Sequence, residues 1–116
     1  MRRGDIYLVD FGRAAGASTS RLEPAVIVTN NGANRAAART ERSAVTVVPL
    51  TTRTETVFPF QVVLSADDTK LGRDTKAHVE QVRSLSALYA DRKLGRVPLH
   101  GMRDIDDALR LHLGLN

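Results

Sequence analysis

Two short runs of apolar, β-branched residues most constrain how this chain can fold. Residues 25–29 read A-V-I-V-T and come directly after Pro24, and residues 44–48 read A-V-T-V-V. β-branched side chains favour strands, and a continuous apolar run of this length is typical of a strand buried on both faces. Proline is tolerated at the first position of a strand, so we expect two central strands that begin at residues 25 and 44.

Three further segments have the character of strands. They are residues 5–11, which lead into the turn sequence G-R-A-A-G, residues 57–64, and residues 76–83. Pro59 interrupts the second of these and indicates an edge or a bulge, since proline cannot donate a ladder hydrogen bond. In residues 76–83 the pattern alternates, with Gln81 on one face and expected to be a buried hydrogen-bonding residue.

Helices are expected only towards the end of the chain. Residues 86–92 are compatible with one short helix capped by Ser84 or Ser86. The final segment predicts an amphipathic helix, because its apolar residues recur at helical spacing: Met102, Ile105, Leu109 and Leu113. About five strands with a terminal helix predict a single α+β domain over residues 1–116, built on a small, strongly curved sheet or barrel.

The charge of the chain favours anionic partners. Lys and Arg number 17 against 13 Asp and Glu, and the basic residues are mostly arginine, whose guanidinium suits phosphates and base edges. A net charge of +4 is equally compatible with a role in solubility alone. The balance therefore tilts towards nucleic acid without establishing it.

Several kinds of site are excluded by composition. The absence of cysteine excludes disulfides, thiolate nucleophiles and Cys-ligated zinc. His78, His100 and His112 lie far apart with no metal-ligand spacing, and we interpret each as an ordinary surface or packing residue. The N-terminus lacks the apolar core of a signal peptide, and no apolar run approaches the ~20 residues that span a bilayer. We therefore expect a cytoplasmic protein with no membrane association.

An ordered set of motifs carries more information than the composition. It comprises R-G-D-I-Y-L-V-D at residues 3–10, P-A-V-I-V eight residues after Gly16, V-V-P-L-T-T at 47–52, F-P-F-Q-V-V-L at 58–64, E-Q-V-R-S at 80–84 and the C-terminal D-D-A-L-R-L-H-L-G-L. Each piece is weak alone, but in this order the set resembles the MazF/PemK (Kid) family of toxin endoribonucleases. The resemblance spans essentially the whole chain.

The resemblance implies both a fold and an activity. It implies a small SH3-like antiparallel β-barrel with a C-terminal helix, assembled as a homodimer and held inactive by a cognate antitoxin. The implied reaction is sequence-specific cleavage of single-stranded RNA without metal or cofactor. Such cleavage uses the 2′-hydroxyl as nucleophile and needs only proton transfer, charge stabilisation and splayed bases.

Two positions carry the implied chemistry. Thr51 matches the active-site threonine of the family, with Thr52 as a neighbour in contact with RNA; from the residues alone, Thr51 could equally close a strand and satisfy a turn amide. The family's second element is an arginine immediately before the proline of the second strand. In this chain Glu23 stands there, before Pro24. A carboxylate at this place would repel the phosphate that the arginine stabilises.

Three explanations of Glu23 remain open. Arg21, two residues earlier, shares a strand face with position 23 and could supply the missing cation. Glu23 could itself act as general base for the 2′-hydroxyl. Alternatively, the chain carries an inactivating substitution at this position. If the loop has another register, Glu23 is only a solvated residue.

The remaining candidates for RNA contact are scattered. Asn34, where the family often keeps an asparagine, and Arg35, together with Arg39 and Arg42, belong to a basic loop expected between the second and third strands, either RNA-facing or merely solvated. Phe58 or Phe60 could stack on a base if exposed, with the other expected in the core. Arg83 is a candidate for phosphate contact.

Two other functions fit the same expected fold. One is a CcdB-like toxin that poisons gyrase by binding and cleaves nothing. The other is an RNA-binding module without activity. The P-L-T-T pattern at residues 49–52 favours the ribonuclease, whereas the missing arginine weakens that preference.

Overall fold

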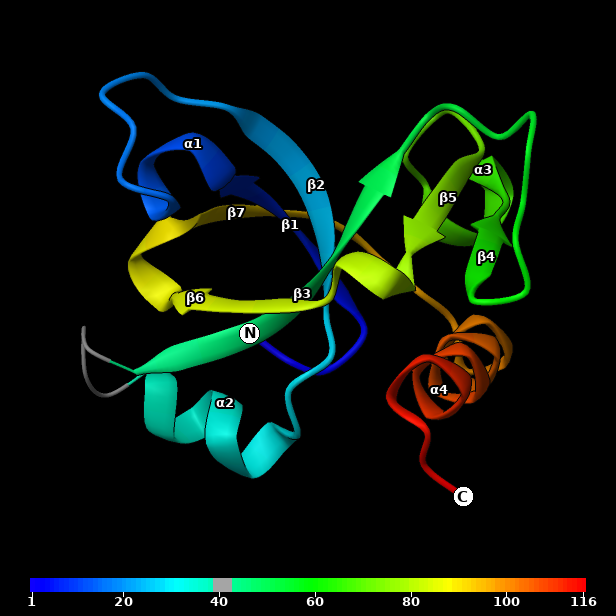
Figure 1. The fold of residues 1–116 in the computed structure, drawn as a ribbon. Coiled ribbons are helices and arrows are strands. Elements are labelled where there is room, and N and C mark those ends of the chain that lie inside the picture. The colour runs from blue at the N-terminus through cyan, green and yellow to red at the C-terminus, as the bar shows by residue number, and fades with distance from the viewer. Residues whose placement is uncertain (39–42) are drawn as a thin grey trace.

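The computed structural model describes residues 1–38 and 43–116 (Figure 1). Arg39 and Arg42 of the expected basic loop lie outside the described residues. Seven strands are found in the described part of the chain: β1 Asp5–Asp10, β2 Leu22–Ile27, β3 Ala44–Thr51, β4 Gln61–Leu64, β5 Thr75–His78, β6 Arg83–Ser86 and β7 Ala90–Arg96. The helices there are α1 Phe11–Ala14, α2 Asn31–Ala37, α3 Ala66–Thr69 and α4 Leu99–Leu113, with the 3-10 turns η1 Val79–Gln81 and η2 Ala87–Tyr89.

All strand pairings in the described residues are antiparallel, in the order β4-β5-β3-β2-β1-β7, with β6 also paired to β3. Strand β3 is shared between two parts of the sheet, because residues 44–47 pair with β6 whereas residues 50–51 pair with β5. In Figure 1, β4 and β5 accordingly stand apart from the β1–β2–β7 part, with β3 running from one to the other. The α+β prediction of a strongly curved antiparallel sheet with a C-terminal helix is confirmed.

The two predicted central strands are buried on both faces. Ala25, Val26 and Ile27 are fully buried, as are Val47 and Val48 of β3. Alternate residues belong to different core clusters: Val26 and Val48 pack in the cluster that includes α4, whereas their neighbours pack in the cluster around Phe11. Burial on both faces explains why these runs are continuously apolar.

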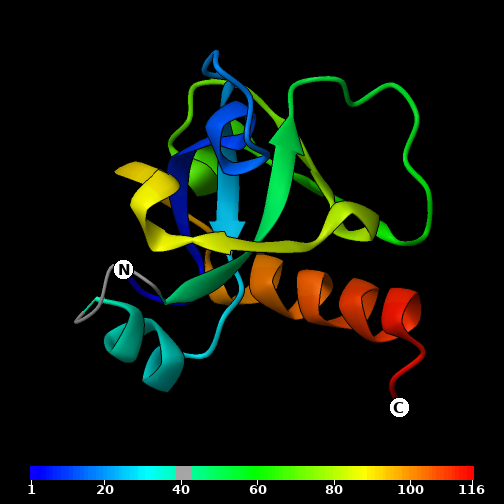
Figure 2. The ribbon, with the colours of Figure 1, turned by 60° about the vertical axis from the view of Figure 1, so that its left-hand side comes forward.

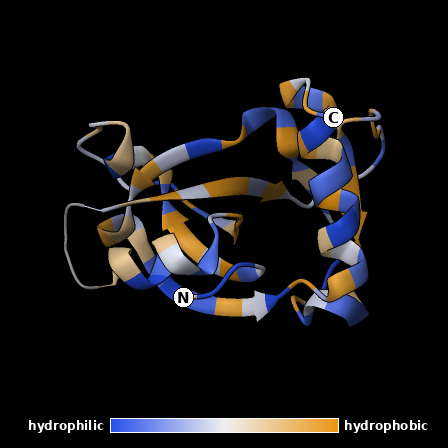
Figure 3. Ribbon diagram, turned by 90° about the horizontal axis from the view of Figure 1, so that it is seen from below, coloured by the Kyte–Doolittle hydropathy of each residue, from blue (hydrophilic) through white to orange (hydrophobic). Residues whose placement is uncertain are grey.

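Helix α4 packs its apolar stripe against the curved sheet. Met102, Ile105 and Ala108 are buried, and Figure 2 shows the helix lying along one side of the sheet. In Figure 3 the helix alternates between hydrophobic and hydrophilic colours, as an amphipathic helix does. Leu113, the last member of the predicted stripe, is exposed instead, because the helix extends beyond its support.

Three sequence-based assignments between residues 22 and 64 are wrong. Strand β2 begins at Leu22, so that Pro24 lies inside it, opposite Leu8 of β1. In the predicted 30–43 loop, residues 31–37 form α2, capped by Asn30, whose Oδ1 accepts a hydrogen bond from the Ala33 amide. The predicted strand over residues 57–64 is limited to β4, which begins after Pro59 and Phe60.

The predicted strand over residues 76–83 is broken into β5, η1 and β6. The short helix predicted at 86–92 is reduced to η2, since residues from Ala90 onward pair with β1 as the edge strand β7. Both differences have the same cause. Hydrogen bonds to neighbouring strands outweigh local preference in these short segments.

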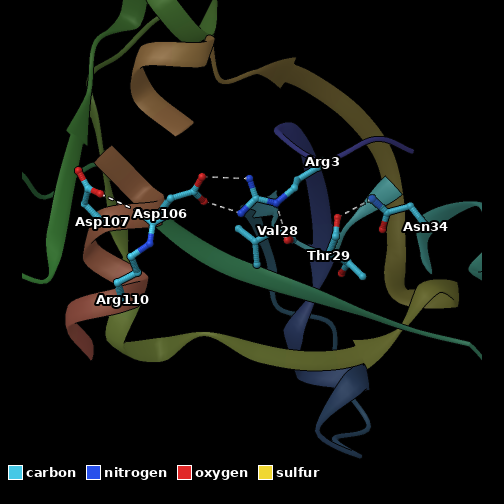
Figure 4. A network of polar contacts seen from close by, with 7 residues as sticks. All are labelled: Arg3, Val28, Thr29, Asn34, Asp106, Asp107 and Arg110. Atoms are coloured by element: carbon cyan, nitrogen blue, oxygen red, sulfur yellow. Dashed lines mark hydrogen bonds and ion pairs between the residues drawn. The ribbon is translucent and has the colours of Figure 1, made fainter. Parts of the chain in front are cut away.

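Arg3 ties the N-terminal segment to α4 and to the end of β2 (Figure 4). Its guanidinium donates to both carboxylate oxygens of Asp106, with Nη2 2.5 Å from Oδ1, and its Nε donates to the carbonyl of Val28 at 2.8 Å. The backbone amide of Arg3 also donates to Asn31 Oδ1 at the start of α2. The side chain of Arg3 thereby contacts α4 and the end of β2, and its backbone amide contacts the start of α2.

Candidate active site

A pocket of about 370 Å³ lies where the start of β2, the end of β3 and the β5–η1 junction meet. It is lined by Glu23, Pro24, Pro49, Leu50, Thr51, Thr52, His78 and Gln81. Two prolines and a leucine supply apolar wall, and the remaining five side chains are polar or charged. The pocket therefore combines apolar surface, against which a base could pack, with groups that can exchange protons and hydrogen bonds.

Strand register explains why Glu23 and Thr51 share this pocket. Ala25 of β2 pairs with Pro49 of β3, and the two strands are antiparallel. Moving two residues along each strand from that pair leads to Glu23 and Thr51, on the same face, because side chains alternate with a period of two. The two positions singled out by sequence are thus neighbours in space.

Thr51 ends β3 with its hydroxyl available to the pocket. Its Oγ1 accepts a hydrogen bond from the backbone amide of Arg53 at 3.2 Å, which fixes the rotamer and leaves the hydroxyl proton to donate. The turn role and the pocket role are compatible, because they use different parts of the same hydroxyl. Thr52 follows it as an exposed residue of the pocket wall.

Arg21 pairs with Glu23 but does not line the pocket. Its Nε lies 3.7 Å from Glu23 Oε1, and both side chains are more than two-fifths exposed. The backbone amide of Arg21 donates to Asp10 Oδ1, which also accepts from the Arg13 amide. The latter hydrogen bond is the main reason that the pKa of Asp10 lies below its usual range, so this anchor stays ionised.

Two guanidinium groups gather over the ring of Phe11, which together with Arg83 lines a separate cavity. The Cζ of Arg83 lies 5.0 Å from the centre of the Phe11 ring, and the Cζ of Arg21 lies 5.9 Å from it. Both are cation–π distances, and Phe11 itself is buried. Arg83 is exposed, so its charge faces solvent near the start of β6, while Arg21 brings a second positive charge close to Glu23.

His78 is a polar member of the pocket that sequence analysis treated as ordinary. It ends β5, opposite Gln61 of β4, and its ring nitrogen Nδ1 lies 3.5 Å from Glu80 Oε1 and 3.4 Å from Gln61 Nε2. Gln61 Nε2 also donates to Glu80 Oε2 at 2.7 Å. The alternation expected over residues 76–83 already puts His78 and Glu80 on one face, but Gln81 reaches the same pocket as His78 only because the chain turns through η1.

The segment between β3 and β4 is braced next to the pocket. Lys76, opposite Thr51 in the register and almost fully buried, donates from Nζ to the carbonyl of Thr56 at 2.7 Å. Gln61 accepts from the amide of Phe58 at 3.1 Å. These two contacts fix residues 52–60 beside the pocket that Thr51 and Thr52 line.

Other candidates from sequence do not lie in the pocket. Asn34 is buried on α2 and its amide donates to the carbonyl of Thr29 at 2.8 Å, so its side chain is engaged within the fold. Arg35 is exposed on the same helix. Phe58 is half exposed and stacks on Phe60, with ring centres 5.6 Å apart. Neither phenylalanine joins a core cluster, which corrects the expectation that one would be buried.

Gln81 also differs from its expectation, since it is exposed and lines the pocket instead of lying in the core. Across residues 1–38 and 43–116, no three His, Asp or Glu side chains cluster as a metal site would require. Over the same residues, no helix is long and apolar enough to cross a membrane.

Comparison with known proteins matches this chain and its fold to a toxin family. The sequence profile of the PemK-like, MazF-like toxins of type II toxin–antitoxin systems matches residues 2–113. The chain belongs to this family. It is 45% identical over 115 residues to endoribonuclease MazF9 of Mycobacterium tuberculosis, covering 99% of this chain and 98% of that protein.

Solved structures of MazF-type proteins share the fold. An endoribonuclease from a mycobacterial species in complex with its cognate antitoxin superposes with a TM-score of 0.78 at 28% identity, over 100% of this chain and 97% of the other. A MazE–MazF complex from Deinococcus radiodurans superposes with a TM-score of 0.75 at 21% identity, over 100% and 97% of the two chains. The MazF-like fold of this chain therefore extends over its described length.

Proposed function

We propose that this MazF-like toxin is an endoribonuclease that cleaves single-stranded RNA sequence-specifically in the pocket lined by Glu23 and Thr51. The observation that carries the proposal is the convergence of these two positions, at the strand ends where the family motifs place them, in one pocket of about 370 Å³. The relation to MazF9, an endoribonuclease at 45% identity, supports the activity. An mRNA substrate would place the protein in the cytoplasm.

The chemistry that we assign to the pocket is transesterification, in which the 2′-hydroxyl attacks the adjacent phosphate and displaces the 5′ oxygen. This reaction needs no metal or cofactor. We assign to the Thr51 hydroxyl, whose oxygen accepts from the Arg53 amide, a hydrogen bond to the scissile phosphate as negative charge develops on it. The apolar wall of Pro24 and Pro49 offers a surface for an unstacked base. Arg83 and Arg21 supply positive charge along the approach to the pocket.

Glu23 puts a negative charge in the pocket, and a carboxylate repels the phosphate. The nearby guanidinium of Arg21 offsets part of that charge, although a partly exposed pair is strongly screened by solvent. A Glu23→Gln variant removes the charge and keeps the shape, whereas Glu23→Arg restores the cation of the family motif. Glu23→Gln should lose activity if Glu23 transfers a proton; a gain in Glu23→Arg identifies an inactivating substitution.

The decisive assay incubates the protein and both variants with a mixed-sequence single-stranded RNA in the presence of EDTA. We expect discrete products ending in a 2′,3′-cyclic phosphate and a 5′-hydroxyl. Failure of all three proteins to cleave, together with inhibition of supercoiling by gyrase, would replace the ribonuclease with a gyrase poison. Binding of RNA without products would indicate a non-catalytic module.

We further propose that the protein forms a homodimer and is inhibited by a cognate antitoxin. Leucine side chains at Leu22 and Leu88 are 52% and 63% exposed and border one cavity with Tyr89, which is apolar surface that an interface would bury. The mycobacterial endoribonuclease that shares this fold was solved with its antitoxin. Light scattering tests the dimer, and co-expression with the neighbouring gene tests the antitoxin.

A further inference from the structure

We propose that His78 is the group that accepts the proton of the 2′-hydroxyl, and that Glu80 acts as the positioning residue for its imidazole. This inference rests on the proposed RNA cleavage and names a further catalytic residue for it. Histidine is the side chain best suited to proton transfer near neutral pH. His78 lines the same pocket as Thr51 and Glu23.

The first argument is the environment of the nitrogen Nδ1. Glu80 Oε1 lies 3.5 Å from it, is shielded from solvent, and has no hydrogen-bond partner in the described part of the molecule. The other oxygen of that carboxylate is held by Gln61 at 2.7 Å. A buried carboxylate oxygen without a donor is costly, so the arrangement favours a proton on Nδ1 directed at Glu80.

The second argument concerns the other ring nitrogen, Nε2. A proton on Nδ1 leaves the lone pair of a neutral imidazole on Nε2. Within the described residues, Nε2 has no hydrogen-bond partner, and the side chain borders the pocket. Once Nε2 accepts a proton, the imidazolium is stabilised by Glu80, as the carboxylate behind a catalytic histidine does in other enzymes.

Strand register places His78 on the side of the sheet that Thr51 occupies. Leu50 pairs with Ala77 and Thr51 pairs with Lys76, so Thr51 and Lys76 share a face of the sheet. His78, two residues beyond Lys76, lies on that same face. The hydroxyl that we assign to the phosphate and the imidazole that we assign to the proton therefore come from adjacent strands.

The charges around His78 come from three elements. Glu80 on η1 lies behind the ring, Glu23 on β2 lies across the pocket, and Lys76 precedes it on β5. The ammonium of Lys76 donates a hydrogen bond to the carbonyl of Thr56. The carboxylate of Glu80, whose Oε1 lies 3.5 Å from Nδ1, therefore faces the imidazolium that the step produces.

The step balances without any further reagent. The O2′–H bond breaks and its proton passes to His78 Nε2, while O2′ forms a bond to phosphorus. The bond from phosphorus to the 5′ oxygen then breaks, and the leaving oxygen takes a proton from water. His78 returns its proton to solvent, leaving a 2′,3′-cyclic phosphate and a 5′-hydroxyl.

The test compares His78→Gln, Glu80→Gln and the matched control His112→Gln, on single-stranded RNA in EDTA. General base catalysis contributes about 10²–10⁴-fold, so we expect kcat of His78→Gln to fall by at least about 10²-fold with KM little changed. Glu80→Gln should lower kcat by roughly tenfold with KM little changed, since the imidazole loses the carboxylate that orients it. His112 is exposed on α4, outside the pocket, and its variant should match the parent.

Folding is checked by thermal unfolding and by binding of the same oligonucleotide with 2′-deoxyribose at the cleaved position. If His78→Gln binds it normally and retains kcat within about threefold, the inference is wrong while the ribonuclease stands. An unchanged kcat in Glu80→Gln, or a loss that appears in KM alone, refutes the positioning role. If only Glu23→Arg cleaves, the same variants are made in that background. If no form cleaves, the proposed function fails and His78 with it.

Discussion

Arg3 and Asp106 form a two-pronged ion pair that joins the first residues of the chain to α4, with Nη2 and Oδ1 2.5 Å apart (Figure 4). Both side chains are 30% exposed, so solvent screens this pair less than a fully exposed one. The Arg3 guanidinium also donates to the carbonyl of Val28. Loss of Arg3 therefore removes contacts to two elements at once.

The pair predicts measurable coupling between the chain ends. Hydrogen bonds to charged groups contribute about 1.5–3 kcal/mol, and partial exposure reduces this, so Arg3→Ala should lower the free energy of unfolding by about 1–2 kcal/mol. A double-mutant cycle with Asp106→Ala should give a coupling of about 1 kcal/mol. Urea denaturation at one fixed protein concentration measures both values.

The matched control is the Asp107–Arg110 pair on the exposed side of α4. Its atoms approach to 2.8 Å, but the side chains are 75% and 53% exposed and only three residues apart. Such a pair contributes about 0.2–0.5 kcal/mol. Equal coupling energies for the two pairs would show that Arg3 has no special role.

Asn34 supports α2 and should matter for stability alone. It is 1% exposed, and its amide satisfies the carbonyl of Thr29 while contacting Asn31 Oδ1. Asn34→Ala leaves that carbonyl without its donor, and we expect a loss of about 1–3 kcal/mol in the free energy of unfolding. RNA cleavage per folded molecule should stay at the parental level. A drop in cleavage at unchanged stability would support the hypothesis that Asn34 contacts RNA.

The sequence predicted the central strands and α4 because their signals are long and mutually consistent. The valine-rich runs in β2 and β3 leave no helical alternative, and the apolar spacing in α4 is regular. Glu23 and Thr51 were singled out by the family resemblance, and the register of β2 against β3 brings the two together. Predictions were accurate where local pattern and tertiary contact agreed.

Other features depend on contacts that a local pattern does not contain. Residues 31–37 begin N-G-A-N, which is typical of a turn, yet Asn30 caps them into α2. Strand β7 contains a glycine and four charged residues and forms because the edge of β1 is available to it. Gln81 lines the pocket together with His78, because the turn η1 breaks the alternation that would have put these two side chains on opposite faces.

The Asp68–His100 contact predicts an acid-sensitive link between α3 and α4. His100 Nε2 lies 2.9 Å from Asp68 Oδ2, and this hydrogen bond is the main reason that the pKa of Asp68 lies below its usual range. A carboxylate with a depressed folded-state pKa adds stability above its unfolded pKa, near 3.8, and loses it as pH falls through the lower folded value.

Asp68→Asn should therefore be less stable than the parent at about pH 6, and the difference should shrink towards about pH 2, where both forms are uncharged at this position. Thermal unfolding across this range measures the difference. Asp67→Asn is the control, because the neighbouring Asp67 is exposed and its variant should track the parent. A constant difference for Asp68→Asn across the range would contradict the link.

Thr51 offers the sharpest separation of a catalytic hydroxyl from a structural one. Thr51→Val keeps the β-branched shape at the end of β3 and removes the oxygen that accepts from the Arg53 amide and faces the pocket. Loss of one donor to developing charge costs about 10²–10³-fold in kcat, whereas loss of one partly exposed turn hydrogen bond costs only about 0.5–1.5 kcal/mol of stability.

The matched variant is Thr52→Val, in the same pocket wall but one residue further, which should weaken RNA binding at most. Cleavage rates in EDTA at saturating RNA distinguish the two positions. If Thr51→Val loses stability but keeps its rate, or if both variants lose the same fraction of kcat, the hydroxyl of Thr51 is a strand cap and the phosphate must be stabilised elsewhere, with Arg83 beside Phe11 as the next group to remove.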